Sequence, residues 1–205
     1  MSFAAFLLAA LVLAITPGPG IAYVVARTVA GGRLEGLASC VGTAIGGFVH
    51  VVAAAAGVSM IVAQSATAFS IIKYLGAAYL IYLGIKILRR PVAVLPVGQV
   101  PAQGARKALR EGIVVEALNV KTALFFLAFL PQFVNSSEPL IPQLLLLGSI
   151  CVMLNTAVDV VAVLAAHRVL TSGITQAARA RLMSRISGVT MIGLGAVLAT
   201  AQHEG

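Results

Sequence analysis

The sequence predicts an all-α polytopic membrane protein with about six transmembrane helices, arranged as two inverted three-helix repeats. Three observations predict this fold class: the composition, the long apolar runs and the placement of the basic residues. Of the 205 residues, 60% are hydrophobic and 10% are charged, whereas about a quarter of a soluble domain is charged. Such a chain cannot cover a core with a water-facing surface, which excludes a soluble domain, a disordered chain and a disulfide scaffold.

Apolar runs of the length that a membrane-spanning helix needs, about 20 residues, follow one another along the chain. They cover residues 3–26, 37–63, 66–88, 112–134, 143–166 and 182–201. The last run is the weakest, because its uncharged part begins after Arg185 and gives a helix of about 24 Å. It spans only if the bilayer thins or if Arg181 and Arg185 snorkel to the interface.

The basic residues predict the orientation. Twelve of the 14 lie on or beside the first, third and fifth connections, whereas the second and fourth carry only Glu138. By the positive-inside rule the odd connections face the cytoplasm and both termini lie outside. If the last run does not span, the C-terminus is cytoplasmic. The net charge of +8 therefore indicates orientation, and no nucleic-acid partner is expected.

Residues 1–205 form a single transmembrane domain of two half-repeats, about residues 1–90 and 106–205. The linker, residues 91–105, is rich in proline and glycine and is expected to be irregular. Because each half has three spans, the second half enters the membrane in the opposite sense. A shift of 103 residues between the halves places residues 16–19 over residues 119–122.

The first span is interrupted by a run of helix-breaking residues: Thr16, Pro17, Gly18, Pro19 and Gly20. The two prolines lack an N–H, so the carbonyls of Leu13 and Ile15 lose their helical partners. We expect Thr16 to cap a second half-helix that starts at Pro17. Free N–H groups and freed carbonyls would then bind a carboxylate and an ammonium at one point. The alternative is a packing kink.

Polar residues in the fourth span are Glu116, Asn119 and Lys121. An ionisable residue near the membrane centre costs about 2.5–3.5 kcal/mol and is normally paired or lines a pathway. Asn119 and Lys121 are therefore candidates for substrate binding. Glu116 lies one turn from the entrance, where an interfacial role and a role in proton coupling are both open.

The fifth and second spans each carry one polar face. Asp159 follows Cys151 and Asn155 at intervals of four residues. It is the expected counter-ion of Lys121 and a candidate for proton coupling, unless the ion pair only fixes helix register. Gly42, Gly46 and His50 form a similar stripe, which favours close helix packing. His50 is either a third proton-coupling candidate or a hydrogen-bonded core histidine.

Nucleotide-binding, serine-hydrolase and metalloprotease motifs are absent from the sequence. We therefore expect no enzyme activity, no cofactor and no metal site.

Three segments resemble the lysine exporter / homoserine and threonine resistance family of bacterial amino-acid exporters. They are residues 16–20, residues 73–86, which read KYLGAAYLIYLGIK, and residues 119–134, which read NVKTALFFLAFLPQFV. The resemblance covers nearly the whole chain. It implies a secondary transporter that exports amino acids, in exchange for protons, across a bacterial cytoplasmic (inner) membrane.

The sequence departs from the family pattern at two places. Val120 stands where the family usually has proline, so the second helix break is expected to be softer than the first. Gly46 and Gly47 lie where exporters of basic amino acids carry an acidic residue. The resemblance therefore implies a small neutral substrate, similar to threonine, homoserine or leucine, or a derivative of one.

The sequence therefore predicts an exporter whose partners are an amino acid, protons and the lipid bilayer, as a monomer or a homodimer. The substrate carboxylate is expected at residues 18–20 and Lys121, and its ammonium at the freed carbonyls. Asp159, Glu116 or His50 would carry the proton. The alternative is a small membrane subunit or a cation-efflux component in which the polar residues only position helices.

Overall fold

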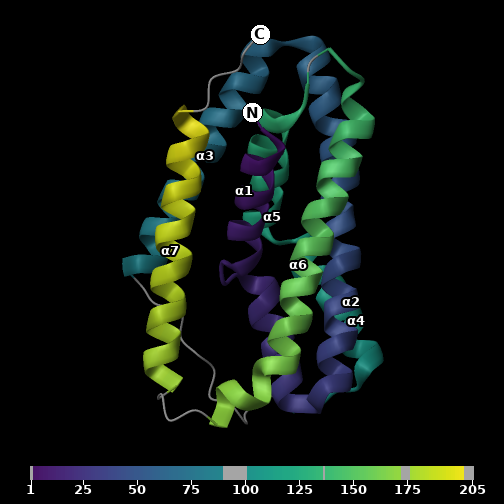
Figure 1. The fold of residues 1–205 in the computed structure, drawn as a ribbon, viewed down its shortest axis with the longest axis vertical. Coiled ribbons are helices and arrows are strands. Elements are labelled where there is room, and N and C mark those ends of the chain that lie inside the picture. The colour runs from purple at the N-terminus through teal and green to yellow at the C-terminus, as the bar shows by residue number, and fades with distance from the viewer. Residues whose placement is uncertain (1, 90–100, 136, 172–175, 201–205) are drawn as a thin grey trace.

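The computed structural model describes residues 2–89, 101–135, 137–171 and 176–200, and every secondary-structure element in these ranges is helical (Figure 1). The helices are α1 (Phe3–Ile15), α2 (Pro19–Gln64), α3 (Ala66–Arg89), α4 (Ala105–Ala117), α5 (Val120–Leu124), the π-helix η1 (Phe125–Phe129), the 3-10 helix η2 (Leu130–Phe133), α6 (Leu140–Thr171) and α7 (Gln176–Thr200). The predicted all-α class is confirmed. Residues 91–100 of the predicted linker, Ala201 and the side chain of Arg181 lie outside the described part.

Helix α2 consists of two arms that reverse direction at Gly32. Its φ of 74° lies in the left-handed region, which glycine adopts without strain. Residues 19–31 form the first arm and residues 33–64 the second. The predicted connection between the first two spans, residues 27–36, is therefore helical except at Gly32. The arms then pack closely, because a Cβ on Gly36 would lie 2.2 Å from Thr28 Oγ1.

A buried ion pair joins the two arms of α2 near this turn. Arg27 Nη1 lies 3.6 Å from Glu35 Oε2, and both side chains are buried. Glu35 Oε1 accepts hydrogen bonds from the backbone N–H groups of Gln103 and Gly104, at 2.8 and 2.6 Å. Gly104 precedes α4 and offers no side-chain cap. The carboxylate of Glu35 therefore ties the start of α4 to the turn of α2, where negative charge favours a helix N-terminus.

The two arms of α2 pack against α4 and α6, and the stripe of small residues forms the contact with α4. A Cβ on Gly42 would lie 2.2 Å from the carbonyl oxygen of Leu109, and one on Gly46 would lie 2.6 Å from that of Ile113. The prediction that this stripe permits close helix packing is confirmed. Helices α3 and α7 form a second closely packed pair.

Three helical segments of the described residues are long and apolar enough to cross a membrane: Pro19–Gly57, Ser70–Arg89 and Leu140–Ala165. A fourth is formed if α4 and residues 120–133, bent by 43°, count as one broken span. α1 and Arg185–Thr200 are shorter apolar helices. The polytopic class is confirmed, while the number of six spans stays a prediction.

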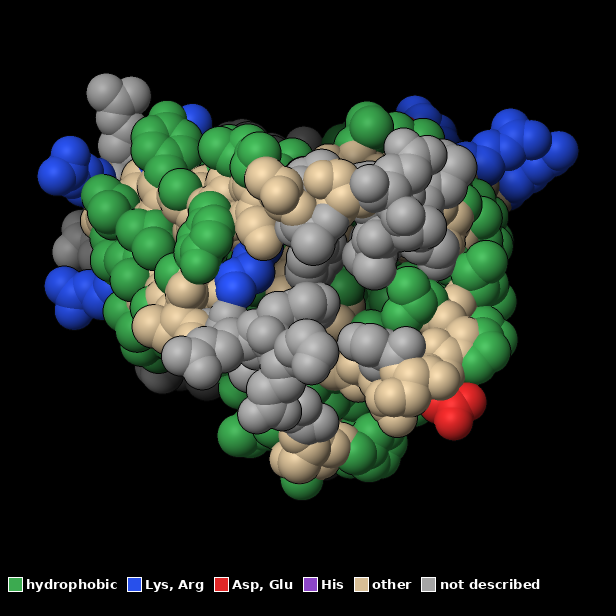
Figure 2. All heavy atoms as spheres, turned by 90° about the horizontal axis from the view of Figure 1, so that it is seen from above, with side chains coloured by type: hydrophobic (Ala, Val, Ile, Leu, Met, Phe, Trp, Pro, Cys, Tyr) green, Lys and Arg blue, Asp and Glu red, His purple; other side chains and the backbone are tan. Residues whose placement is uncertain are grey.

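The described helix ends lie at two opposite ends of the molecule. The start of α1 and the end of α7 lie at one end of the molecule, and the Gly32 turn lies at the other (Figure 1). Seen from the end that holds the start of α1, hydrophobic side chains gather around the rim (Figure 2). Many large apolar side chains are exposed, among them Leu8, Leu75, Leu146 and Met153. This surface suits contact with lipid.

Candidate functional site

The first helix break separates α1 from α2 at residues 16–18. Thr16 is the C-cap of α1: its N–H donates to the carbonyls of Val12 and Leu13, and its hydroxyl also donates to Val12. α2 begins at Pro19, and the carbonyl of Gly18 accepts from the N–H of Ala22. The break is confirmed, but the prediction that Thr16 caps the second half-helix is wrong. Its hydroxyl is already bonded within α1.

The second helix break separates α4 from α5 at Leu118 and Asn119. Asn119 is the N-cap of α5, and its Oδ1 accepts a hydrogen bond from the N–H of Lys121 at 3.1 Å. The N–H of Asn119 donates to the carbonyl of Glu116 at 2.9 Å. The chain therefore breaks here without a proline at position 120, because the asparagine side chain replaces the lost helical acceptor.

The two breaks meet through the side chain of Lys121. Its Nζ donates hydrogen bonds to the carbonyl oxygens of Leu13 and Thr16, at 3.1 and 2.9 Å. A Cβ on Gly18 would lie 3.1 Å from the same nitrogen. The buried ammonium of Lys121 is thus held by two backbone carbonyls of the first break, which we call the carbonyl pair.

The predicted ion pair between Lys121 and Asp159 is wrong: among the described residues, no carboxylate lies within 4 Å of Lys121 Nζ. The physical reason is that the carbonyl pair already solvates the ammonium, while Asp159 has a different partner. Thr43 Oγ1 donates to Asp159 Oδ2 at 3.1 Å.

Glu116 lies beside the first break from the opposite side. Its Oε2 accepts from Asn119 Nδ2 at 3.0 Å, and its Oε1 accepts from Thr122 Oγ1 at 2.6 Å. A Cβ on Gly20, in the first turn of α2, would lie 2.5 Å from Oε2. Glu116 is buried, so it is part of this site and does not lie at the surface.

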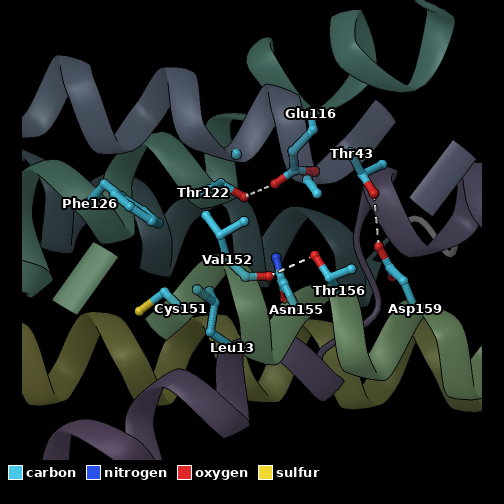
Figure 3. A pocket seen from close by; sticks show the side chains of 12 residues that line it. Leu13, Thr43, Glu116, Thr122, Phe126, Cys151, Val152, Asn155, Thr156 and Asp159 are labelled. Atoms are coloured by element: carbon cyan, nitrogen blue, oxygen red, sulfur yellow. Dashed lines mark hydrogen bonds between the residues drawn. The ribbon is translucent and has the colours of Figure 1, made fainter. Parts of the chain in front are cut away.

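A small cavity lies between these groups (Figure 3). Its lining residues come from both halves of the chain: Leu13, Thr43, Ala44, Gly47, Glu116, Thr122, Phe126, Cys151, Val152, Asn155, Thr156 and Asp159. The volume open to water is about 10 Å³, room for roughly one water molecule. Two carboxylates line the cavity and no basic residue does, which favours a cationic group. The expectation that Cys151, Asn155 and Asp159 share one face is confirmed.

His50 lies next to the second break but does not line the cavity. Its Nε2 lies 2.8 Å from the carbonyl oxygen of Glu116. Since a carbonyl only accepts, Nε2 carries the proton of this hydrogen bond. The side chain is therefore a hydrogen-bonded core histidine that binds a carbonyl freed at the break.

Three hydroxyl groups of the site were missing from the candidates named from the sequence. Thr43 binds Asp159, Thr122 binds Glu116, and Ser187 donates a hydrogen bond to the carbonyl of Pro17. Ser187 thereby brings α7 to the first break. Serine and threonine are common in membrane helices, so their presence does not indicate a site. Only their spacing from the acidic residues could have pointed to these three hydroxyl groups, and that spacing is a weak indication.

Comparison with known proteins assigns the chain to a family of transporters. The sequence pattern of the LysE type translocator family matches residues 11–202. A membrane protein of Vibrio cholerae is 32% identical over 204 residues, which cover 97% of this chain and 96% of the relative. The homoserine/homoserine lactone efflux protein of Salmonella typhimurium is 29% identical over 199 residues, with the same coverage. No solved structure matches the chain. The chain, an all-helical membrane protein, therefore belongs to the LysE type translocator family.

Proposed function

We propose that this chain is a secondary transporter that exports a small neutral amino acid or a derivative of one, in exchange for protons, across the bacterial inner membrane. The observation that carries the proposal is the meeting of the two helix breaks beside a cavity. There Lys121 binds the carbonyl pair and Glu116 contacts Gly20, while Asp159 lines the cavity opposite. The name of the Salmonella relative supports homoserine, its lactone and molecules of similar size as substrates.

The site offers groups for both ends of an amino acid. The first turn of α2 provides N–H groups at the positive end of a helix, where a carboxylate binds favourably. Glu116 and Asp159 favour an ammonium in the cavity. Leu13, Phe126 and Val152 provide the apolar wall for a short side chain. The site lies within one chain, so the predicted homodimer is not required for it.

Proton exchange follows from the charges of the cavity. An ammonium bound beside a carboxylate favours the charged form of that carboxylate and so opposes its proton. A substrate amine and a proton therefore compete at Asp159 and Glu116. A transporter can exchange a substrate for a proton when the two compete for the same site.

The proposed inverted repeat gives this site a means of opening. The two breaks keep the register of 103 residues, because Thr16 and Asn119 each lie at a break. The packing is symmetric as well: α3 packs on α7, and the second arm of α2 packs on α6, where Gly47 faces Val152 and Gly148 faces Val51. In transporters of this design, one repeat moves against the other around a fixed site. Such a movement would open the present cavity to an amino acid.

Counterflow in proteoliposomes tests the transport function. We expect the purified chain to exchange labelled threonine, homoserine, homoserine lactone or leucine for the unlabelled compound, and to accumulate it when a proton gradient is imposed. Liposomes without protein provide the control for passive leak of the lactone. If no compound in a panel of amino acids and their derivatives is exchanged faster than this leak, the proposed function is wrong.

Asp159→Asn is expected to uncouple transport from protons. Asparagine keeps the shape of the side chain and accepts from Thr43, but it cannot take up a proton. Counterflow should therefore persist, whereas accumulation driven by a proton gradient should be lost and the rate should become independent of that gradient. Glu138→Gln, which changes an exposed carboxylate on the fourth connection, is the matched control. An unchanged response to the gradient would assign proton coupling to Glu116 or another group.

Gly20→Ala is expected to lower counterflow by at least about tenfold, which corresponds to about 1.4 kcal/mol of lost substrate binding. The added methyl would lie 2.5 Å from Glu116 Oε2 and displaces that carboxylate from Asn119 and Thr122. Gly57→Ala, on the same helix with no neighbouring atom within 4 Å, should transport like the parent protein. Equal rates for both variants would show that Glu116 is not held at the first turn of α2 during transport.

A further inference from the structure

We infer that the carbonyl pair of Leu13 and Thr16 is an ammonium-binding site that Lys121 and the substrate share. Lys121 fills it in the empty transporter and leaves it when the ammonium of the substrate enters. This inference rests on the proposed function. It gives Lys121 a role different from binding the substrate carboxylate, namely that of a tethered competitor for the substrate amine.

The chemistry of the carbonyl pair requires a cationic or strong hydrogen-bond donor. Pro17 cannot donate to the carbonyl of Leu13, which keeps the N–H of Thr16 as a helical partner at 3.2 Å, and α1 ends before Thr16. Both are buried and both accept from the ammonium of Lys121. Since the loss of a donor is unfavourable for a buried carbonyl, the pair favours an occupant in every state of the transport cycle.

The position of Lys121 allows it to leave. Only two of its three ammonium hydrogens are used by the carbonyl pair, and no ion pair within 4 Å fixes it among the described residues. Glu116 and Asp159 are the carboxylates whose charges act on it, and they line the cavity. They can accept the ammonium of Lys121 when it moves out of the carbonyl pair.

The carbonyl pair is also within reach of a molecule in the cavity. Leu13 both lines the cavity and supplies one of the two carbonyls, whereas Lys121 itself is not part of the lining. A ligand ammonium thus approaches from the cavity, and Lys121 approaches from α5 beside Gly18. Gly18 leaves this approach open, because a Cβ there would lie 3.1 Å from both Cε and Nζ of Lys121.

The inference predicts different roles for Lys121 in counterflow and in net export. In counterflow the transporter crosses the membrane with substrate each time, so the substrate fills the carbonyl pair in place of Lys121. In net export the transporter returns empty, and only Lys121 is available to fill the pair. Loss of Lys121 should therefore lower net export more than exchange.

The test measures both modes on the full-length chain carrying Lys121→Ala. We expect the ratio of net export to counterflow to fall by at least about tenfold relative to the parent protein. Lys73→Ala, which removes another buried lysine from α3, is the matched control and should change the two modes in equal proportion. If Lys121→Ala is not folded, the same split is expected in Lys121→Gln, whose amide can still donate to one carbonyl.

A binding measurement with methylammonium is independent of transport. This ion should fill the vacated carbonyl pair and raise the melting temperature of the Lys121→Ala protein in a saturable way, because a ligand of the native state stabilises it. Parent protein and Lys73→Ala, in which Lys121 competes for the pair, should respond only at higher concentrations. Equal responses in all three proteins, or equal loss of net export and counterflow in the Lys121 variants, would overturn the inference. Absent counterflow in the parent protein would instead refute the proposed function.

Discussion

Gly42→Ala is expected to prevent stable packing of α2 on α4. The added methyl carbon would lie 2.2 Å from the carbonyl oxygen of Leu109 and 3.1 Å from the Cα of Gly112. Both are backbone atoms of a helix, so the contact is relieved only if the helices separate. Overpacking of this kind costs about 1–3 kcal/mol and occasionally more. We expect the upper end of that range, measured as a lower melting temperature and a smaller yield of folded protein in detergent.

Gly57→Ala provides the matched control for this prediction. It makes the same substitution on the same helix, at a position where, in the described part of the chain, no atom outside the adjoining helix backbone lies within 4 Å of the added carbon. Alanine favours a helix over glycine, so this variant should be as stable as the parent protein or more stable. If both variants unfold at the same temperature, the close approach of α2 and α4 does not determine stability.

Arg27→Met is expected to destabilise the protein by about 3–5 kcal/mol, the cost of leaving one member of a buried ion pair without its partner. Glu35 is buried, and its Oε2 accepts no hydrogen bond in the described part of the chain, so the charge of Arg27 at 3.6 Å offsets it. Arg27 also donates to the carbonyl of Pro101. The start of α4 should therefore loosen together with the turn of α2.

A double-mutant cycle separates the charge from the packing. The Arg27→Met, Glu35→Gln double variant removes both charges, while the glutamine oxygen still accepts from the N–H groups of Gln103 and Gly104. It should be more stable than Arg27→Met alone, with a coupling free energy of about 0.5–3 kcal/mol. Additive effects in the unfolding measurements would mean that the pair contributes nothing beyond its separate contacts.

The sequence predicted the membrane class and the position of the first break because both depend on local features. Apolar composition indicates a bilayer, and two closely spaced prolines break a helix wherever it packs. The second break was harder to predict, since Val120 permits a helix and the interruption depends on the side chain of Asn119. The glycine stripe indicated close packing, but nothing in its pattern specified α4 as the partner.

The partners of the buried charged residues could not be predicted in the same way. Backbone carbonyls carry no signal in a sequence, so the sequence predicts the mid-span acid Asp159 as the counter-ion of Lys121, although Lys121 binds Leu13 and Thr16. The sequence likewise predicts Arg27 on the first connection, because basic residues mark cytoplasmic connections. The structure instead places it inside a helix, where Glu35 compensates its charge across the turn at Gly32.

The bonds that close the first break have a consequence for the order in which the protein is made. The carbonyls of Leu13 and Thr16 accept hydrogen bonds from Lys121, and that of Pro17 accepts one from Ser187, so their donors are synthesised much later than they are. Until those later residues have been made, the three carbonyls lack these donors. Closure of the first break is thus a late event in biosynthesis, and α7 takes part in it.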